Sequence, residues 1–323
     1  MEMLQTIKND ILSSKLIDKE QALALETAPL NELCMAANEI RDIFCSNDFD
    51  ICTIINGKSG RCSENCKYCA QSSFYGTKVD EHPLLDTSEI VAQAKYNDER
   101  GVLRYSIVTS GKSLNDHEIG KVCESIKAIK AQTSISVCIS FGLLNEAQFK
   151  KLKSAGVERI HNNLETSRKY FPNICTTHTY DDKIMAIKAA QQAGLSVCSG
   201  GIMGLGESME DRIDMALTLR ELGVHSIPVN MLNPIPGTPY ENNKILTNDE
   251  ICRIVAIFRF ILPKGFIRLA GGRGLLTDKG RKCLLSGANA VISGDMLTTA
   301  GVSIQNDMKM IEELGYKVVL RNE

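Results

Sequence analysis

Cys62-Ser-Glu-Asn-Cys66-Lys-Tyr-Cys69 places three cysteines at the spacing C-x3-C-x2-C, with no fourth cysteine close by. Three thiolates can hold three irons of a cubane iron–sulfur cluster and leave the fourth iron open to a chelating ligand. A closed structural zinc site needs four protein ligands, so the spacing favours an open cluster over a zinc knuckle or a disulfide framework. Gly and Ser in the flanking segments 56–60 and 72–76 predict a loop in which the thiolates converge.

The composition is that of an ordinary globular protein. The 323 residues are 43% hydrophobic and 24% charged, and the formal net charge of −2 gives no reason to expect nucleic acid as a partner. No apolar run is long enough to cross a membrane, and residues 1–10 lack the order of a secretion signal, so we expect a cytoplasmic protein. Twelve cysteines in a reducing compartment indicate metal or redox chemistry.

Hydrophobic periodicity divides the chain near residue 46. Residues 1–46 carry apolar side chains at helical spacing and predict an N-terminal extension of two helices. Over 47–323, short apolar runs alternate with amphipathic segments. This alternation predicts a TIM-type (β/α)8 barrel, and an open doubly wound sheet is the alternative. The predicted strands are 51–55, 103–108, 134–139, 157–161, 195–198, 226–230, 266–269 and 290–293.

Local signals support helices between these strands. Capping residues open helices at Thr87 and Asn145, and the periodic segments 180–193 and 209–222 are each followed by a Gly. In a parallel barrel, chemistry belongs at the C-terminal ends of the strands. The loop 57–76, which holds the three cysteines, directly follows the first predicted strand, as that rule requires.

Several motifs together carry a family resemblance. Tyr68, just before the third cysteine, makes the cysteine motif similar to that of the radical S-adenosylmethionine (SAM) superfamily. The whole set resembles the biotin synthase family from about the first predicted strand to the Thr298–Thr299 pair. Besides the cysteine motif, it comprises 161–166, 197–207, 229–232, 236–239, 267–273, 287–290 and 297–299.

The resemblance implies a radical reaction. SAM would bind the open iron of a [4Fe-4S] cluster held by Cys62, Cys66 and Cys69, and an electron would cleave it to a 5′-deoxyadenosyl radical. Inserting one sulfur into dethiobiotin breaks two unactivated C–H bonds, so two SAM molecules would be used for each biotin. The implied partners are dethiobiotin, a low-potential electron donor of the flavodoxin or ferredoxin type, and a second copy of the chain in a homodimer.

The resemblance also assigns binding residues. The SAM pocket would include Tyr68, Asn163, Glu165, Lys183, Gly200, Gly201 and Glu207. Glu165 stands where the family has Asp, and Lys183 where it has an Arg, which puts the second contact in doubt because Lys lacks the planar fork. Dethiobiotin would contact Asn163, Asn230, Thr298 and Thr299. Without the resemblance, the glycines are a tight turn, Asn230 a strand-end residue, and the threonines caps of a helix beginning near residue 301.

An auxiliary iron–sulfur cluster is implied as the sulfur source. Its family ligands match Cys138, Cys198 and Arg268, but the remaining cysteine position falls at Ser106, and a new cysteine, Cys52, lies on the first predicted strand. We therefore predict a relocated ligand set of Cys52, Cys138 and Cys198 with Arg268 close by. Three thiolates favour a four-iron cluster with an extra sulfide, with a [2Fe-2S] cluster as the alternative. Cys52 as a buried apolar side chain is the competing interpretation.

The remaining cysteines have a plain explanation. Cys34 and Cys45 are predicted to be buried apolar side chains, and Cys123, Cys252 and Cys283 to be structural. Cys175 is the first candidate for an exception, because it lies near a ligand-bearing loop. Two other functions fit the cysteine motif, namely a maturase for a metal cofactor on the same barrel and a non-catalytic metal-binding or redox protein.

Overall fold

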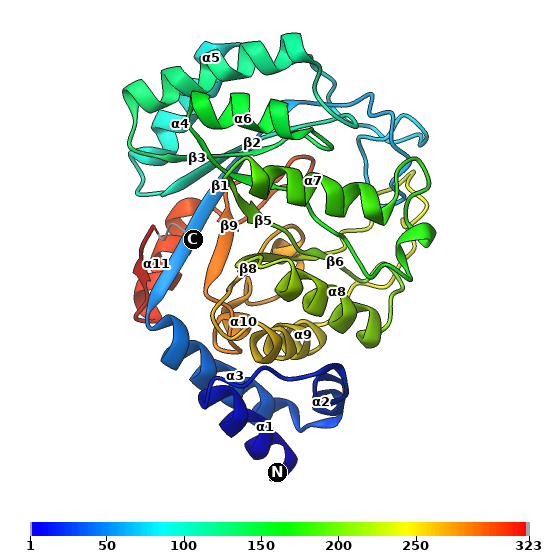
Figure 1. Ribbon diagram of the computed structural model, residues 1–323, viewed down its shortest axis with the longest axis vertical. Coiled ribbons are helices and arrows are strands. Elements are labelled where there is room, and N and C mark those ends of the chain that lie inside the picture. Colours follow the sequence, from blue (N-terminus) through cyan, green and yellow to red (C-terminus); the bar gives the residue numbers. More distant parts are fainter. Residues whose placement is uncertain (1, 321–323) are drawn as a thin grey trace.

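The computed structural model describes residues 2–320 and contains a closed barrel of parallel strands surrounded by helices (Figure 1). The neighbours of β1 are β2 and β9, and this pairing closes the ring and confirms the predicted TIM-type (β/α)8 fold over an open sheet. The strands are β1 (Asp48–Lys58), β2 (Arg104–Thr109), β3 (Ser136–Ser140), β4 (Val157–His161), β5 (Ser196–Cys198), β6 (Gly201–Met203), β7 (Ser226–Met231), β8 (Phe266–Leu269), β9 (Ala290–Ser293) and β10 (Lys317–Val318).

The helices follow the strands on the outside of the barrel, and most begin with a capping box. Asn145 caps α6 and Thr179 caps α7 in this way, each accepting a hydrogen bond from the backbone N–H of the third helical residue. The outer helices are α4 (Thr87–Asp98), α5 (Asp116–Gln132), α6 (Glu146–Ala155), α7 (Tyr180–Gln192), α8 (Met209–Glu221), α9 (Asn248–Ile261), α10 (Arg281–Leu284) and α11 (Ile304–Glu313), with short 3₁₀ turns at Phe171–Asn173 and Arg273–Leu275.

One barrel position is filled by two short strands, β5 and β6, separated by Ser199 and Gly200. The first pairs with β4 and with Ser226 of β7, and the second pairs with β7 at Val229, Asn230 and Met231. Gly200 sits so close to β7 that a Cβ atom there would lie 1.9 Å from the carbonyl oxygen of Pro228. The break therefore depends on glycine, because any other residue would clash with β7.

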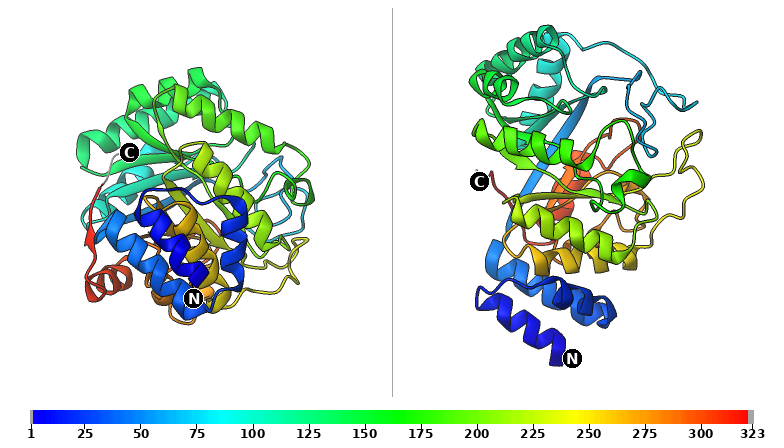
Figure 2. Two further views of the ribbon diagram at one scale, coloured as in Figure 1. Left: turned by 60° about the horizontal axis from the view of Figure 1, so that its bottom comes forward. Right: turned by 45° about the vertical axis from the view of Figure 1, so that its right-hand side comes forward.

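The N-terminal extension has three α-helices where the sequence predicted two. They are α1 (Glu2–Leu12), α2 (Lys19–Ala24) and α3 (Leu30–Cys45), with a 3₁₀ turn at Leu25–Thr27. A short helix such as α2 lacks the length for a periodic pattern, and it is fixed instead by a capping box between Asp18 and Gln21 and by Lys19, whose amine lies 2.7 Å from both Glu210 and Asp214. Figures 1 and 2 show the three helices below the barrel, where α3 packs against α9.

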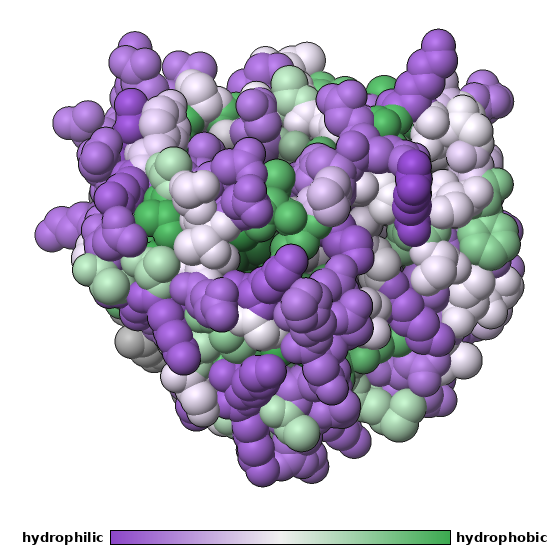
Figure 3. Space-filling model, turned by 90° about the horizontal axis from the view of Figure 1, so that it is seen from above, coloured by the Kyte–Doolittle hydropathy of each residue, from purple (hydrophilic) through white to green (hydrophobic). Residues whose placement is uncertain are grey.

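Side chains of the barrel strands alternate between the outer helices and the interior. On β2, Tyr105 and Ile107 are fully buried among the outer helices, whereas Arg104, Ser106 and Val108 line an internal cavity. The outer surface seen in Figure 3 is mostly hydrophilic, with apolar atoms visible in patches between charged side chains. Within residues 2–320, no helix is long and apolar enough to cross a bilayer.

Candidate active site

The barrel encloses a cavity of about 350 Å³, a size that suits a small organic ligand. Residues from nine strands, β1 to β9, and from several of the loops that follow them contribute to its wall, so it lies where a barrel enzyme carries its chemistry. Among the predicted site residues, the wall contains Cys52, Tyr68, Cys69, Cys138, Asn163, Glu165, Cys198, Asn230, Arg268, Thr298 and Thr299.

The loop with the three cysteines closes over this cavity. Its turn is held by the backbone N–H of Cys62, which donates to Gln71 at 2.9 Å, and by the N–H of Cys69, which donates to the carbonyl of Cys66 at 3.0 Å. Tyr68 and Cys69 line the cavity, whereas Cys62 and Cys66 stand behind them. Burial, together with the neighbouring Cys62, raises the pKa of the Cys69 thiol to about 11.

A second set of thiols lies deeper, on the inner wall of the barrel. Cys52 on β1, Cys138 on β3 and Cys198 on β5 are all buried and line the same cavity. Burial raises the pKa of Cys52 to about 12. Burial would also raise the pKa of Cys198, but a hydrogen bond with His161 and the nearby guanidinium groups lower it to about 7. The hydroxyl of Ser106, beside Cys138 in register, is buried and has no hydrogen-bond partner within the described part of the chain.

A cluster of buried charges forms the floor beneath these thiols. The carboxylate of Asp50 accepts hydrogen bonds from Arg104 Nε at 2.9 Å and from Arg268 Nη2 at 2.8 Å, and Arg159 Nη1 lies 3.8 Å away. Burial alone would raise the pKa of Asp50, but the three guanidinium groups outweigh it and lower the pKa to about 2. Arg268 also donates through Nη1 to Cys52 Sγ at 3.4 Å, which links the charges to the thiols.

The residues predicted for the SAM pocket fall into two groups. Asn163 and Glu165 follow β4 inside the cavity, where Asn163 Oδ1 accepts from the N–H of Gly200 at 3.0 Å and Asn163 Nδ2 donates to Glu165 at 3.3 Å. Glu165 has a φ of 71°, and burial raises its pKa. Lys183, Gly200, Gly201 and Glu207 are not part of the cavity wall. Lys183 donates to Asn162 at 3.1 Å, and Glu207 pairs with Arg212 at 2.6 Å.

Asn230, Thr298 and Thr299, which the sequence predicted for the substrate together with Asn163, also line the cavity. Asn230 donates from Nδ2 to the carbonyl of Gly201 at 3.1 Å and accepts from the N–H of Gly271 at 2.9 Å. Its amide is thereby oriented, and one N–H and one lone pair are left for a ligand. Thr298 and Thr299 line the mouth of the cavity and do not cap a helix, because the N-cap of α11 is Ser303.

Comparisons with known proteins agree with this arrangement. Residues 58–219 match the family model described as the radical SAM superfamily, and residues 228–317 match the Biotin and Thiamin Synthesis associated domain. A biotin synthase of Brachyspira hyodysenteriae is 61% identical over 320 residues, covering 99% of this chain and 96% of that protein. A biotin synthase of Akkermansia muciniphila is 57% identical, covering 99% and 100%. The chain belongs to the biotin synthase family.

Solved structures that resemble this member of the biotin synthase family share its fold, at low sequence identity. A methylornithine synthase superposes with a TM-score of 0.84 at 19% identity, over 97% of each chain. A maturase of the [FeFe]-hydrogenase gives 0.79 at 22% identity, over 98% of this chain and 74% of that one. Family membership implies a [4Fe-4S] cluster and SAM, and it identifies the chain as a radical SAM sulfurtransferase.

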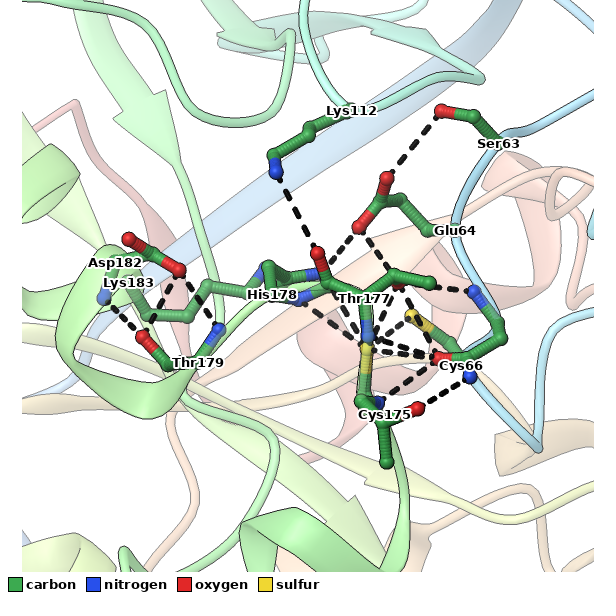
Figure 4. Close-up of polar contacts among 12 residues, drawn as sticks. Ser63, Glu64, Cys66, Lys112, Cys175, Thr177, His178, Thr179, Asp182 and Lys183 are labelled. Atoms are coloured by element: carbon green, nitrogen blue, oxygen red, sulfur yellow. Dashed lines mark hydrogen bonds and ion pairs between the residues drawn. The ribbon is translucent and has the colours of Figure 1, made fainter.

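Sequence reasoning overlooked several residues of this family member's site. His161 lines the cavity beside Cys198, its partner in the β4–β5 register, although the sequence placed it only within a motif. Asp50 and Arg159 of the charged floor were not singled out either. Strict alternation along β1 and β4 could have identified them, since Asp50 and Arg159 are two residues from Cys52 and His161. Two further residues were missed: His178, which contacts Cys175, and Glu64, which contacts His178 (Figure 4).

Proposed function

We infer that this chain inserts sulfur into dethiobiotin and forms biotin, acting as a radical SAM sulfurtransferase. The observation that carries this inference is one cavity lined by Cys69 of the cysteine loop, by Cys52, Cys138 and Cys198 of the barrel strands, and by the amides of Asn163 and Asn230. A substrate held in that space would lie between the group that removes hydrogen and the group that supplies sulfur.

Cys62, Cys66 and Cys69 would hold the [4Fe-4S] cluster. The donor set fits, because the three thiols lie on one short loop in which the N–H of Cys69 donates to the carbonyl of Cys66 at 3.0 Å, and Cys69 lines the cavity. When bound, the reduced cluster with SAM supplies a 5′-deoxyadenosyl radical that can remove hydrogen from unactivated carbon. Tyr68, Asn163, Glu165 and the backbone at Gly200 and Gly201 would hold SAM, with Lys183 and Glu207 supporting the pocket from behind its wall.

The protein itself binds and orients the substrate. Asn230 presents one free N–H and one free lone pair, a pattern that suits the N–H and C=O of a cyclic urea such as the ring of dethiobiotin. Asn163 would reach the same ring, and Thr298 and Thr299 at the mouth would hold the carboxylate tail. Tyr68, Cys69, Ala70 and Gln71 of the loop line the cavity and would shield a bound substrate from solvent.

Cys52, Cys138 and Cys198 would hold the auxiliary cluster that donates sulfur. The fit is supported by three buried thiols that line the same cavity and by the buried hydroxyl of Ser106, which faces that cavity and has no partner among residues 2–320. Arg268 is already engaged, with Nη1 on the carbonyl of Val291 at 2.9 Å and Nη2 on Asp50. It is therefore better suited to donate a hydrogen bond than to serve as the fourth ligand.

The charged floor supports the four-iron alternative. Three guanidinium groups and one carboxylate leave a net charge of two positive units beneath the thiols. A [4Fe-4S]²⁺ cluster with three thiolates and an added hydrosulfide carries two negative charges, whereas a [2Fe-2S]²⁺ cluster with three thiolates and a neutral fourth ligand carries one. The more negative group is better compensated by this floor, since buried charge of one sign is costly without a partner.

The remaining partners are part of the same proposal. Reduction of the cluster needs a low-potential electron donor of the flavodoxin or ferredoxin type, and a homodimer remains the expected assembly. A reducing cytoplasm is expected because all twelve cysteines lie within the described residues and are free there.

The test is turnover by anaerobically purified, cluster-loaded protein given dithionite, SAM and dethiobiotin. We expect biotin together with about two 5′-deoxyadenosine per biotin. Replacing Cys62, Cys66 or Cys69 by Ala should abolish SAM cleavage, because the cluster loses a thiolate. SAM cleavage without any biotin would favour another radical SAM enzyme on this barrel, and no SAM cleavage would favour a non-catalytic redox protein.

A further inference from the structure

A second group of metal-binding side chains lies behind the cysteine loop, away from the cavity. Cys175 Sγ lies 3.8 Å from Cys66 Sγ, and the ring nitrogens Nδ1 and Nε2 of His178 lie 3.4 and 3.8 Å from Cys175 Sγ. The three ligand atoms are all within 4.8 Å of one another. Figure 4 shows Cys175 and His178 on one loop, facing Cys66 on the other.

These spacings fit one tetrahedral metal ion. With metal–sulfur bonds of about 2.3 Å and metal–nitrogen bonds of about 2.0–2.1 Å, a tetrahedral centre separates two sulfurs by about 3.8 Å and a sulfur from a nitrogen by about 3.6 Å. The observed Sγ–Sγ distance is 3.8 Å and the Sγ–Nε2 distance is 3.8 Å. Thiolates on two different irons of a cubane diverge, so Cys66 and Cys175 are placed to share one ion rather than two corners of a cluster.

The histidine is oriented as a metal ligand would be. Glu64 Oε2 lies 2.6 Å from His178 Nδ1, which leaves Nε2 as the free ring nitrogen. The same carboxylate oxygen accepts a hydrogen bond from Thr177 Oγ1 at 2.8 Å. Glu64 and His178 are both buried, so this pair is shielded from competing water. A carboxylate that fixes the far nitrogen of a histidine is the usual outer partner of a zinc-binding imidazole.

The loop carrying Cys175 is itself held against the cysteine loop. Asn65 Oδ1 accepts from the N–H of Thr176 at 2.9 Å and of Thr177 at 3.2 Å. Lys67 N donates to the carbonyl of Ile174 at 2.9 Å. Cys66 is only half-buried, which leaves a path for an ion from solvent. These contacts hold the loop that carries Cys175 and His178 against the loop that carries Cys66.

We propose that Cys66, Cys175 and His178 bind one borderline divalent cation, Zn²⁺ or Fe²⁺, in the chain that has not yet received its [4Fe-4S] cluster. The fourth position is left to water or a small anion. Cys66 belongs to both sites, so the two occupants exclude each other; this consequence rests on the proposed role of Cys66 in the cluster. Fe²⁺ bound at this site would be the first iron loaded for cluster assembly on the cysteine loop. Zn²⁺ bound at this site would block that assembly.

Metal binding is tested with Co²⁺ on full-length, cluster-free, reduced protein. Cys52, Cys62, Cys69, Cys138 and Cys198 are replaced by Ser in the test background, so that the other two thiol sets are silent. We expect one equivalent of Co²⁺ with thiolate-to-metal charge-transfer absorption, lost in Cys175→Ser and in His178→Gln and retained in the matched control Cys123→Ser. Zinc-edge X-ray absorption should show a mixed sulfur and nitrogen shell. Equal Co²⁺ stoichiometry and spectra in the background and its Cys175→Ser variant would overturn the site.

Competition is tested by rebuilding the [4Fe-4S] cluster in the otherwise native chain, with and without one equivalent of Zn²⁺. Zinc should slow reconstitution on the order of tenfold in the native chain, because bound zinc stabilises the cluster-free form. Reconstitution of Cys175→Ser should be unaffected, because this variant lacks the zinc site. The variant should still give the electron paramagnetic resonance signal of the reduced cluster. Separate arms with Fe²⁺ and Zn²⁺ distinguish a loading site from an inhibitory one. Equal inhibition of both proteins by zinc would refute the shared ligand, whereas binding without competition would refute the role of Cys66 in the cluster.

Discussion

At the scale of single residues, Asn230 joins architecture to recognition. It ends its run on β7 with each end of the amide fixed by a backbone group, Gly201 on one side and Gly271 on the other. An amide free to rotate could present oxygen or nitrogen to a ligand, and these two contacts remove that ambiguity. The residue is therefore structural and ligand-directed together, and the two roles are separable by experiment.

Asn230→Ala should weaken dethiobiotin binding by about 1–3 kcal/mol, because a buried polar partner of the substrate is left unpaired. SAM binding, measured by calorimetry on the cluster-loaded protein, should change little. Thermal unfolding of the same variant controls for the lost backbone contacts. Equal loss of affinity for both ligands would identify a purely structural residue.

Asp50 decides the stability of the charged floor. Its pKa falls from an ordinary 3.8 to about 2, so the carboxylate contributes stability that is fully present above about pH 4 and is lost as the pH falls towards 2. The difference corresponds to about 2 kcal/mol. Denaturant unfolding of cluster-free protein should show this loss of stability between pH 5 and pH 2. In Asp50→Asn, the free energy of unfolding should depend less on pH over the same range.

Asp50→Asn should also destabilise the cluster-free chain by about 3–5 kcal/mol at pH 7, because three buried guanidinium groups lose their counterion. A bound negative cluster compensates those cations, so the penalty should shrink after reconstitution. The same penalty with and without clusters would mean that the floor does not interact with the auxiliary cluster.

At the scale of elements, the break between β5 and β6 shapes the cavity. Gly200→Ala would place a Cβ atom 1.9 Å from the carbonyl oxygen of Pro228, so β7 must move or the break must distort. We expect a loss of about 1–3 kcal/mol in unfolding free energy. The matched control is Gly120→Ala on α5, where a Cβ atom meets nothing within 4 Å. This control should raise the free energy of unfolding by about 0.5–1 kcal/mol, because alanine is the better helix former. Similar unfolding curves for the two variants would contradict the close-approach argument.

Elements with a strong period were predictable from the sequence, and elements fixed by tertiary contacts were not. All eight predicted runs, such as Val157–His161, became barrel strands, because apolar alternation reports burial directly. The short strand β6 and the helix α2 depend on pairing with β7 and on a cap, which leave little periodic signal. The cysteine motif marked a ligand loop, but the contact of Cys66 with Cys175 joins residues 109 positions apart, and no local pattern encodes it.

At the scale of the whole molecule, the barrel keeps two sets of thiols apart while directing both into one cavity. The loop after β1 carries one set, and β1, β3 and β5 carry the other, so β1 contributes to both ends of the site. The length of β1 sets the distance between the two sets of thiols. Cys52 and Ile54 both point into the cavity from β1, and the cysteine loop begins where this strand ends. In the proposed auxiliary cluster, Cys52 would supply a thiolate from β1 without disturbing the loop.

Cys52→Ser should therefore remove the auxiliary iron and abolish biotin formation while SAM cleavage at the loop cluster continues. The loss should be four irons per chain for a four-iron cluster and two for a [2Fe-2S] cluster, and Mössbauer spectra of anaerobically purified protein distinguish them. Ser106→Ala is the matched control, because it faces the same cavity and offers no thiolate, so its iron content should equal that of the native chain. An iron-edge anomalous map should place density against Cys52, Cys138 and Cys198. Full auxiliary iron in Cys52→Ser would reject the relocated ligand and leave sulfur insertion into dethiobiotin as the function.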